Sequence, residues 1–274
     1  VCKGGSFRPP IFLEAFMTHA LLPASARDRL VLALDVDAPM EVETWLDRLQ
    51  DSVRWLKIGP RLFTGSGPAL IDALVARDFR VFLDLKFHDI PEVVAGAVRE
   101  AVRRGVSMLT MHTSGGLRMM QAAVEAARDE ASRRNTPPPI LLGVTVLTSL
   151  TSEDLLELGF QHGAEESVDR LARLAHRAGL DGVVCSPLEV SRVKGLEGGA
   201  LVVLTPGIRP SASVAFAPGR EEGSSHAPDD QRRIATPAQA VRSGADFLVV
   251  GRPILRAADP EEAIAQVLRE IEQA

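Results

Sequence analysis

Three ionisable side chains crowd the end of one apolar run. Residues 81–91 read Val-Phe-Leu-Asp-Leu-Lys-Phe-His-Asp-Ile-Pro, which places Asp84, Lys86 and Asp89 just before Pro91. On a β-strand, side chains alternate between two faces, so Asp84 and Lys86 share one face and Leu85 takes the other. Charges at the end of a buried strand cost free energy unless they are paired or used in chemistry. A structural ion pair is one interpretation, but the third charge favours a catalytic site.

Charges of both signs alternate along a longer part of the chain, because Asp35 and Lys57 precede Asp84, Lys86 and Asp89. Lysines between carboxylates neutralise them and displace a cation, so the series disfavours a magnesium site. Such a network keeps a lysine protonated and ready to deliver a proton to a developing carbanion. It also sets a carboxylate against a negative group on the substrate, which favours loss of that group as carbon dioxide.

Two arginines near the end of the chain indicate a site for phosphate. The segments Thr-Pro-Gly-Ile-Arg209 and Val-Gly-Arg252-Pro each combine an arginine with a glycine, which lets backbone N–H groups approach an anion. The planar guanidinium group of arginine donates two parallel hydrogen bonds to a phosphate. Either arginine alone could be a surface residue in a turn, but the pair on successive apolar runs favours an anion site.

These residues follow a repeated pattern of short apolar runs and helical stretches. Apolar spacing of three and four, as in 93–102, is typical of the helices, and runs that are apolar on both faces are typical of a parallel sheet. The repeats predict an α/β fold, a single-domain (β/α)8 TIM barrel, whose usual size is about 250 residues. An open doubly wound sheet is the rival, but no Gly-x-Gly-x-x-Gly follows the first run. The expected strands are Leu30–Leu34, Val53–Ile58, Arg80–Leu85, Met108–Met111, Ile140–Val144, Gly182–Cys185, Leu201–Leu204 and Phe247–Val250.

A barrel places its active site at the carboxyl ends of its strands. Charged and hydroxyl residues, with one histidine and one glycine, lie near or beyond the ends of the expected strands, and we therefore predict that they meet around one opening. They are Asp35, Lys57, Asp84, Lys86, Asp89, His112, Thr145, Thr148, Ser186, Arg209, Gly251 and Arg252. His88 and His112 could be acid–base residues, but we favour structural histidines near the rim, and we expect Cys185 to be a small buried apolar residue.

The composition excludes several classes of protein. The 274 residues are 46% hydrophobic with a net charge of −5 and no basic stripe, which disfavours binding to nucleic acid. Cys2 and Cys185 are too few for a disulfide framework or a zinc site. No apolar run approaches the roughly 20 residues of a membrane helix. We expect a cytoplasmic protein that does not associate with membranes.

Two segments fall outside the repeated pattern. Residues 1–29 are interpreted as an N-terminal extension that is partly disordered, with Met17 as a plausible natural start, and residues 30–274 as the barrel domain. The loop at 210–230, next to the expected phosphate site, is long and rich in Ser, Ala, Gly and Pro. It is either a mobile lid or a tolerated surface extension, and we favour the second.

Several motifs, in order, resemble the orotidine 5′-phosphate decarboxylase family. The eight residues from Asp84 to Pro91 match the signature of that family, and the resemblance extends over about Leu30 to Ile254. The other matching segments are Leu-Ala-Leu-Asp35, Leu-Lys57-Ile-Gly, Val-Thr-Val-Leu-Thr148-Ser, Pro-Gly-Ile-Arg209-Pro, Asp-Asp-Gln231-Arg-Arg and Val-Gly251-Arg252-Pro. The resemblance implies decarboxylation of orotidine 5′-phosphate to UMP in pyrimidine biosynthesis, without cofactor or metal.

The resemblance also implies catalytic roles. Lys86 would protonate C6 of the pyrimidine, and Asp84 would lie beside the departing carboxylate. Asp89 would reach across the interface of a homodimer into the neighbouring subunit's site. Asp35 and Lys57 would hold the ribose hydroxyls, and Lys57 would belong to the charge network as well.

The remaining roles concern binding of the nucleotide. Thr148 would contact the edge of the pyrimidine. The 5′-phosphate would be held by Gln231, Arg209 and the turn of Gly251 and Arg252. Remote contacts to the phosphate would promote closure of loops over the site.

The sequence departs from the family at two places, the long loop at 210–230 and the residues after Pro91. Glu92 and Val93 follow Pro91 where the family has Asn-Thr, so a hydroxyl expected to meet the substrate is missing.

A sugar-phosphate aldolase or synthase on the same fold would use Lys86 as a Schiff base or bind magnesium through the carboxylates. A non-catalytic nucleotide-binding module is the other rival, although loss of function would release these costly buried charges.

Overall fold

Eight parallel strands form a closed barrel in this computed structural model, which describes residues 22–36, 39–49, 52–211 and 233–274. Each strand pairs with the next one along the chain, and β8 pairs with β1 to close the sheet. The strands are β1 Leu30–Ala33, β2 Trp55–Ile58, β3 Arg80–Phe87, β4 Met108–His112, β5 Ile140–Val144, β6 Gly182–Val184, β7 Val202–Thr205 and β8 Phe247–Val250. The predicted (β/α)8 barrel is confirmed, and the doubly wound sheet is excluded.

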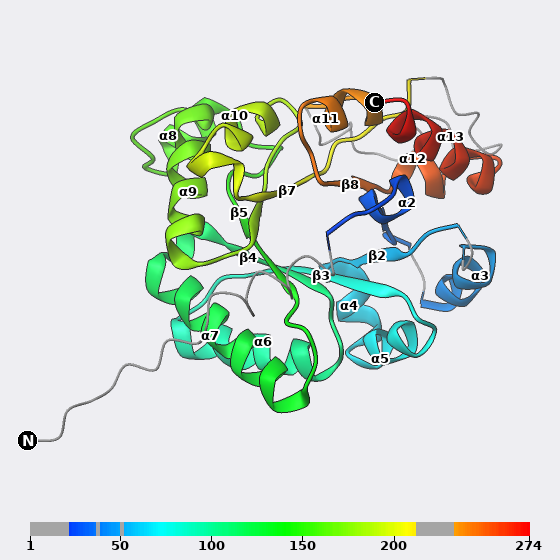
Figure 1. Cartoon of the computed structure of the whole chain (residues 1–274), viewed down its shortest axis with the longest axis horizontal. Helices are drawn as coiled ribbons and strands as arrows, with labels where there is room; N and C mark the ends of the chain where they lie inside the picture. The colour runs from blue at the N-terminus through cyan, green and yellow to red at the C-terminus, as the bar shows by residue number, and fades with distance from the viewer. Residues whose placement is uncertain (1–21, 37–38, 50–51, 212–232) are drawn as a thin grey trace, which may run out of the picture.

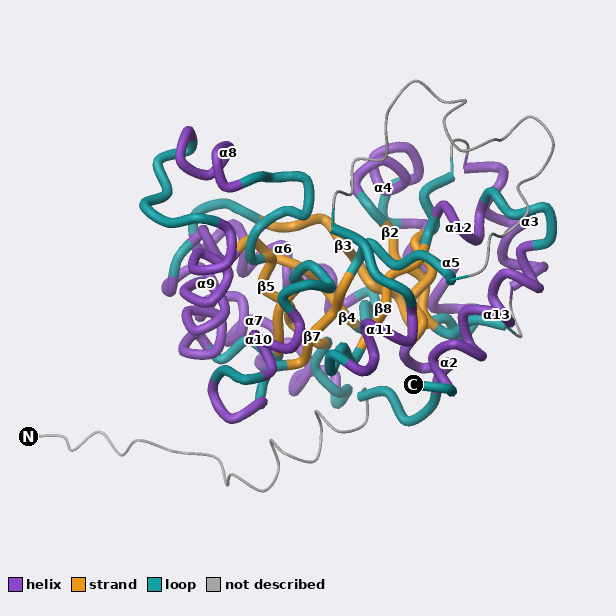
Figure 2. The backbone as a smooth tube through the Cα atoms, turned by 90° about the horizontal axis from the view of Figure 1, so that it is seen from above, coloured by secondary structure: helices purple, strands orange, loops and turns teal. Residues whose placement is uncertain are grey.

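Helices surround the barrel (Figure 1), and the view from above shows the strands between them (Figure 2). The helices are α2 Ala26–Arg29, α3 Pro39–Leu49, α4 Pro60–Ser66, α5 Ala69–Ala76, α6 Pro91–Arg103, α7 Leu117–Arg134, α8 Ser152–Glu157, α9 Ala164–Ala178, α10 Val190–Lys194, α11 Pro237–Arg242, α12 Arg252–Leu255 and α13 Pro260–Glu272. Two short 3-10 helices are η1 Thr113–Gly115 and η2 Glu197–Gly199. None of the described helices is both long enough and apolar enough to cross a membrane.

Helix α6 shows how the spacing of apolar residues attaches a helix to the barrel. Pro91 occupies its first turn, where the missing N–H of proline costs nothing. Val94, Val98 and Ala101 recur at intervals of three and four and are buried against the strands and α7. The helix starts immediately after the Asp84–Pro91 segment, so its packing fixes where that segment leaves the barrel.

The core has two layers because strand side chains alternate between the inside and the outside of the barrel. Leu30 and Leu32 of β1 belong to the large cluster between the strands and the helices. Val31 belongs to a smaller cluster inside the barrel, where Trp55 and Phe247 pack edge to face with their ring centroids 5.4 Å apart. Complete burial of such a side chain contributes about 1.5–3 kcal/mol to stability.

The same alternation positions the charged residues. Ala33, Trp55 and Phe82 belong to the interior cluster. Two positions later, each of these strands carries a charged side chain on the interior side, at the carboxyl end of the barrel. These charged residues are Asp35, Lys57 and Asp84.

The segments that the sequence set apart lie largely outside the described residues. Residues 1–21 and 212–232 are not described, so the predicted N-terminal extension, the long loop and Gln231 stay predictions. Helix α2, which precedes Leu30, packs against α13, and Arg29 donates a hydrogen bond to the carbonyl oxygen of Ala245 at 3.0 Å. Packed structure therefore begins within the segment assigned to the extension.

Candidate active site

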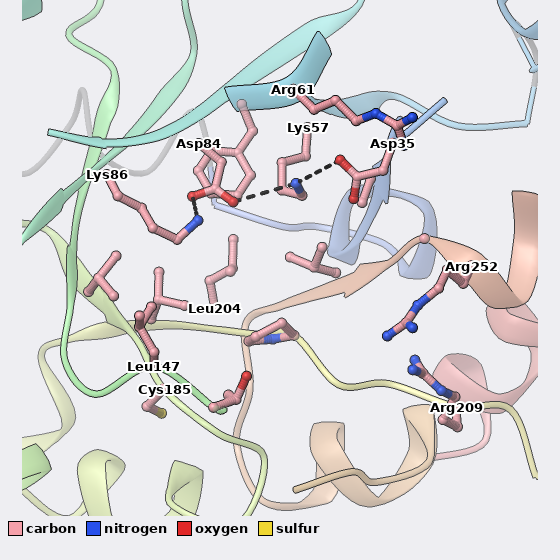
Figure 3. Close-up of a pocket in the computed structure, with 18 of the residues that line it drawn as sticks. Asp35, Lys57, Arg61, Asp84, Lys86, Leu147, Cys185, Leu204, Arg209 and Arg252 are labelled. Atoms are coloured by element: carbon pink, nitrogen blue, oxygen red, sulfur yellow. Dashed lines mark hydrogen bonds and ion pairs between the residues drawn. The ribbon is translucent and has the colours of Figure 1, made fainter. Parts of the chain in front are cut away.

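A cavity of about 470 Å³ at the carboxyl ends of the strands contains a row of alternating charges (Figure 3). Lys57 Nζ lies 3.5 Å from Asp35 Oδ1 and 3.5 Å from Asp84 Oδ2. Lys86 Nζ lies 2.9 Å from the other oxygen of Asp84, Oδ1. Side chains from β3 and from the ends of β1 and β2 therefore form one continuous series of ion pairs. We call this series the charge row, and its order is Asp35, Lys57, Asp84, Lys86.

Strand β3 loses its regular geometry at Lys86. The strand extends to Phe87, beyond the predicted end at Leu85, but Lys86 has a positive φ of 52°. The pairing of β3 with β4 shifts register between Leu83 and Phe87. The expectation that Asp84 and Lys86 share one face is nevertheless confirmed, because both line the cavity while Leu85 packs against the outer cluster. The ammonium group of Lys86 donates a hydrogen bond to Asp84 Oδ1.

Asp84 is a buried carboxylate that stays ionised. Burial raises the pKa of Asp84, but the charges of Lys57 and Lys86 and hydrogen bonds from Lys86 and Thr110 outweigh burial and lower the pKa below its ordinary value. Two ammonium partners and a hydroxyl donor compensate for the free energy that it costs to bury this charge. The site therefore presents a fixed negative charge beside a lysine.

Arginines form the opposite part of the cavity. Figure 3 shows Arg209 and Arg252 across the cavity from Lys86, with their guanidinium groups converging on one another. Arg209 follows β7, and Arg252 begins α12. Gly251 before it lies close to β1, since an added Cβ would come within 3.1 Å of Ala33 Cβ. This corner has the charge and the donor geometry to bind a phosphate group.

Apolar side chains also line the cavity. They include Phe82, Val144, Leu204 and Val249, and Thr148 adds a hydroxyl to the wall. An apolar wall with a few polar groups is typical of a pocket for a small planar molecule. The cavity can therefore hold a ligand with a phosphate at one end and a flat ring near Lys86.

Some predicted residues do not line this cavity. Asp89 is exposed, and its Oδ1 accepts a hydrogen bond from its own neighbour, Ile90 N, at 2.6 Å. His88 and His112 contact one another, with ring centroids 5.4 Å apart, and burial, with the charges of His88 and Lys86, lowers the pKa of His112. Val93, which replaces the expected threonine, is half exposed on α6.

Two further predicted residues have structural contacts. Thr145 donates a hydrogen bond to the carbonyl oxygen of Val184 at 2.9 Å. Ser186 N donates to Glu189 Oε2 at 2.9 Å, and both residues are buried. Cys185 is buried as expected, although it also contributes to the cavity wall, and burial raises the pKa of its thiol.

Sequence reasoning missed Arg61, Arg256 and Thr110. Arg61 and Arg256 line the cavity from the first turn of α4 and from the end of α12. Thr110 donates a hydrogen bond to Asp84 Oδ1 at 2.9 Å. The alternation along β4 could have identified it, because Thr110 lies two positions after the interior residue Met108. Among the described residues, no three His, Cys, Asp or Glu side chains are grouped as metal ligands.

Comparison with known proteins identifies the family. The model of the orotidine 5′-phosphate decarboxylase / HUMPS family matches residues 28–267, which include all eight strands. The chain belongs to this family. Orotidine 5′-phosphate decarboxylase of Moorella thermoacetica is 46% identical over 248 residues, which are 90% of this chain and 93% of that protein. The protein of the same name from Laribacter hongkongensis is 50% identical over 231 residues, 84% of this chain and 88% of that protein.

Two solved structures align with most of the chain. The crystal structure of orotidine 5′-phosphate decarboxylase from Lactobacillus acidophilus aligns with a TM-score of 0.73 and 33% identity, over 88% of this chain and 98% of that one. An uncharacterised conserved protein from Geobacillus kaustophilus aligns with a TM-score of 0.74 and 32% identity, over 88% of this chain and 99% of that one. The family resemblance seen in the sequence motifs is confirmed.

Proposed function

We propose that this protein is a carbon–carbon lyase that converts orotidine 5′-phosphate to UMP, and that Lys86 supplies the proton that replaces the carboxylate. The decisive observation is the distance of 2.9 Å between Lys86 Nζ and Asp84 Oδ1 in a cavity whose other end holds Arg209 and Arg252. Family membership and relatives that are 45–50% identical support the reaction. The charge row supports the role of the lysine.

The reaction can be written with the side chains of the cavity alone. The bond between C6 and the carboxylate breaks, carbon dioxide leaves, and the electron pair stays on C6. The ammonium group of Lys86 then transfers a proton to C6, which gives UMP and a neutral amine that takes its proton back from water. Asp84 is ionised and would lie beside the substrate carboxylate, so the two negative charges would repel one another in the bound substrate. This repulsion would be relieved as carbon dioxide departs.

The remaining cavity residues would bind the nucleotide. Asp35 and Lys57 of the charge row would hold the ribose hydroxyls, and Thr148 would contact the pyrimidine. Arg209 and Arg252, with Gly251 and Gln231, would bind the 5′-phosphate. Because the phosphate is remote from C6, its binding energy can position the ring without direct contact to the reacting bond.

The proposal includes a homodimer with active sites shared between two chains. Asp89 is exposed, and the neighbouring apolar side chains of Ile90 and Val93 are 65% and 50% exposed. Exposed apolar side chains beside a charged residue of the signature segment are consistent with cover by a second subunit. Asp89 would then enter the neighbouring site. We also propose a cytoplasmic location, with the nucleotide rather than nucleic acid or a membrane as the binding partner.

The test is the loss of orotidine 5′-phosphate absorbance with purified protein and with the variant Lys86→Ala. Positioned proton transfer contributes about 10²–10⁴-fold, so the variant should lose at least about 99% of kcat. Retention of more than about a tenth of wild-type kcat would remove Lys86 from this role. Neither a chelator nor borohydride should reduce the wild-type rate, since inhibition by either would support the aldolase or synthase alternative.

Lys194→Ala is a matched control. Lys194 also pairs with a carboxylate, at 2.7 Å from Asp246 Oδ2, and its exposed fraction of 24% is close to the 31% of Lys86. Asp246 directly precedes β8, so this pair lies at the amino ends of the strands, opposite to the cavity. The control should keep the wild-type kcat, which would show that the loss in Lys86→Ala is not a general effect of breaking an ion pair.

A further inference from the structure

Thr110 on β4 contacts the last two members of the charge row, Asp84 and Lys86, but does not line the cavity. Its hydroxyl lies 3.0 Å from the backbone nitrogen of Lys86 and 2.9 Å from Asp84 Oδ1. The same Asp84 oxygen accepts from Lys86 Nζ at 2.9 Å. Lys86 backbone, Thr110 hydroxyl, Asp84 carboxylate and Lys86 ammonium therefore form a closed ring of hydrogen bonds.

The direction of each bond in this ring follows from the number of protons available. A backbone N–H can only donate, so the Thr110 oxygen accepts from Lys86. An ionised carboxylate can only accept, so the single hydroxyl proton of Thr110 points to Asp84. The hydroxyl thereby satisfies the Lys86 backbone and stabilises the charge on Asp84 with the same atom. Valine has the same shape as threonine but can do neither.

The backbone at Lys86 needs such a partner. A positive φ is unfavourable for a residue with a side chain, and Lys86 adopts a φ of 52°. The ladder between β3 and β4 shifts register at this point, between Leu83 and Phe87. The Thr110 hydroxyl, fully buried on the neighbouring strand, accepts the N–H of Lys86 within this interrupted part of the ladder.

We propose that Thr110 is a positioning residue, which holds Lys86 and Asp84 in the mutual geometry needed for proton transfer. It acts through these two residues and does not touch the substrate. The inference rests on the proposed role of Lys86 as the proton donor. Positioning of this kind affects the rate more than the binding of substrate, because the affected groups act at C6 and the arginines bind the distant phosphate.

Steady-state kinetics of Thr110→Val over a range of pH test the inference. The variant should lose about tenfold to hundredfold in kcat, since small displacements of catalytic groups have effects of this size, while KM changes by less than about threefold. Loss of the hydroxyl removes one of the contacts that lower the pKa of Asp84, so the acidic limb of the pH–rate profile should move to higher pH. Thr110→Ser keeps the hydroxyl and should recover most of the rate and the wild-type acidic limb.

Thr113→Val is the matched control. Thr113 is an equally buried threonine, three positions further along, whose hydroxyl donates to the backbone oxygen of Val144. This variant should keep the wild-type kcat and pH profile. Circular dichroism and thermal melting establish that each variant is folded, and Thr110→Ala provides the same kinetic comparison should Thr110→Val not fold.

The outcomes separate this inference from the proposed function. A wild-type kcat and acidic limb in folded Thr110→Val would overturn the positioning role, and so would an equal loss in Thr113→Val or a loss confined to KM. If Lys86→Ala is inactive in that case, the proposed role of Lys86 stands and only the inference about Thr110 fails. An active Lys86→Ala would overturn both.

Discussion

Replacement of Arg252 by glutamine isolates one charged contact to the phosphate. Arg252 and Arg209 direct their guanidinium groups toward one another on the side of the cavity opposite to Lys86 (Figure 3). Arg252→Gln keeps a hydrogen-bond donor of smaller reach and removes the charge. Arg209 stays in place, and Arg252 lies across the cavity from Lys86. The variant should therefore weaken binding of the phosphorylated substrate and leave the charge row unchanged.

The expected size of the effect is that of one hydrogen bond to a charged group. Such a bond contributes about 1.5–3 kcal/mol. With about 1.36 kcal/mol for each factor of ten, kcat/KM for orotidine 5′-phosphate should fall by roughly 10- to 150-fold. The loss should come mainly from KM, which should rise at least about tenfold.

The decisive comparison uses orotidine, which lacks the phosphate. Wild type and Arg252→Gln should have the same kcat/KM for orotidine, because orotidine carries no phosphate for the arginine to bind. Arg269→Gln is the control, since Arg269 lies on the outer helix α13 in an exposed ion pair with Glu262 and should leave both substrates unaffected. An equal loss on both substrates would refute the reasoning, because Arg252 would then act through the fold and not through the phosphate.

Three further predictions address the charge row, the assembly and the thiol. The pKa of Asp84 is lower in the folded protein than the value of about 3.9 in an unfolded chain. The ionised carboxylate therefore stabilises the fold above about pH 4, and this stabilisation is lost as the pH falls through the folded pKa. Urea unfolding should therefore show a difference between wild type and Asp84→Asn that narrows below about pH 4, and a constant difference would contradict the low pKa. If Asp89 enters the neighbouring site, mixed subunits of Asp89→Asn and Lys86→Ala should regain up to about a quarter of wild-type activity by random pairing, whereas exchange proven by mass without activity would place Asp89 in its own site. Because burial raises the pKa of the Cys185 thiol, iodoacetamide at pH 8 should label it only after denaturation, and peptide mapping of the native protein would detect a contrary result.

The sequence by itself predicted the barrel, because strand and helix periodicities are local properties. The runs at 140–144 and 247–250 are apolar at every position and became β5 and β8 with the predicted bounds. The sites at strand ends followed from the same pattern, since parallel strands in a barrel carry their carboxyl ends to one opening. Asp35, Lys57, Asp84 and Lys86 could therefore be grouped before any contact between them was known.

Only the tertiary structure decided how these groups meet. Thr110 contacts the backbone of Lys86 across 24 positions of sequence, and that contact exists only once β3 has paired with β4 in a shifted register. Local propensity likewise does not predict the positive φ of Lys86, because a residue other than glycine adopts such an angle only where surrounding contacts compensate for the strain. Arg256, directly after α12, reaches the cavity because β8 closes the barrel against β1. Local periodicity determined which residues arrive at the opening, whereas register and closure determined which atoms touch.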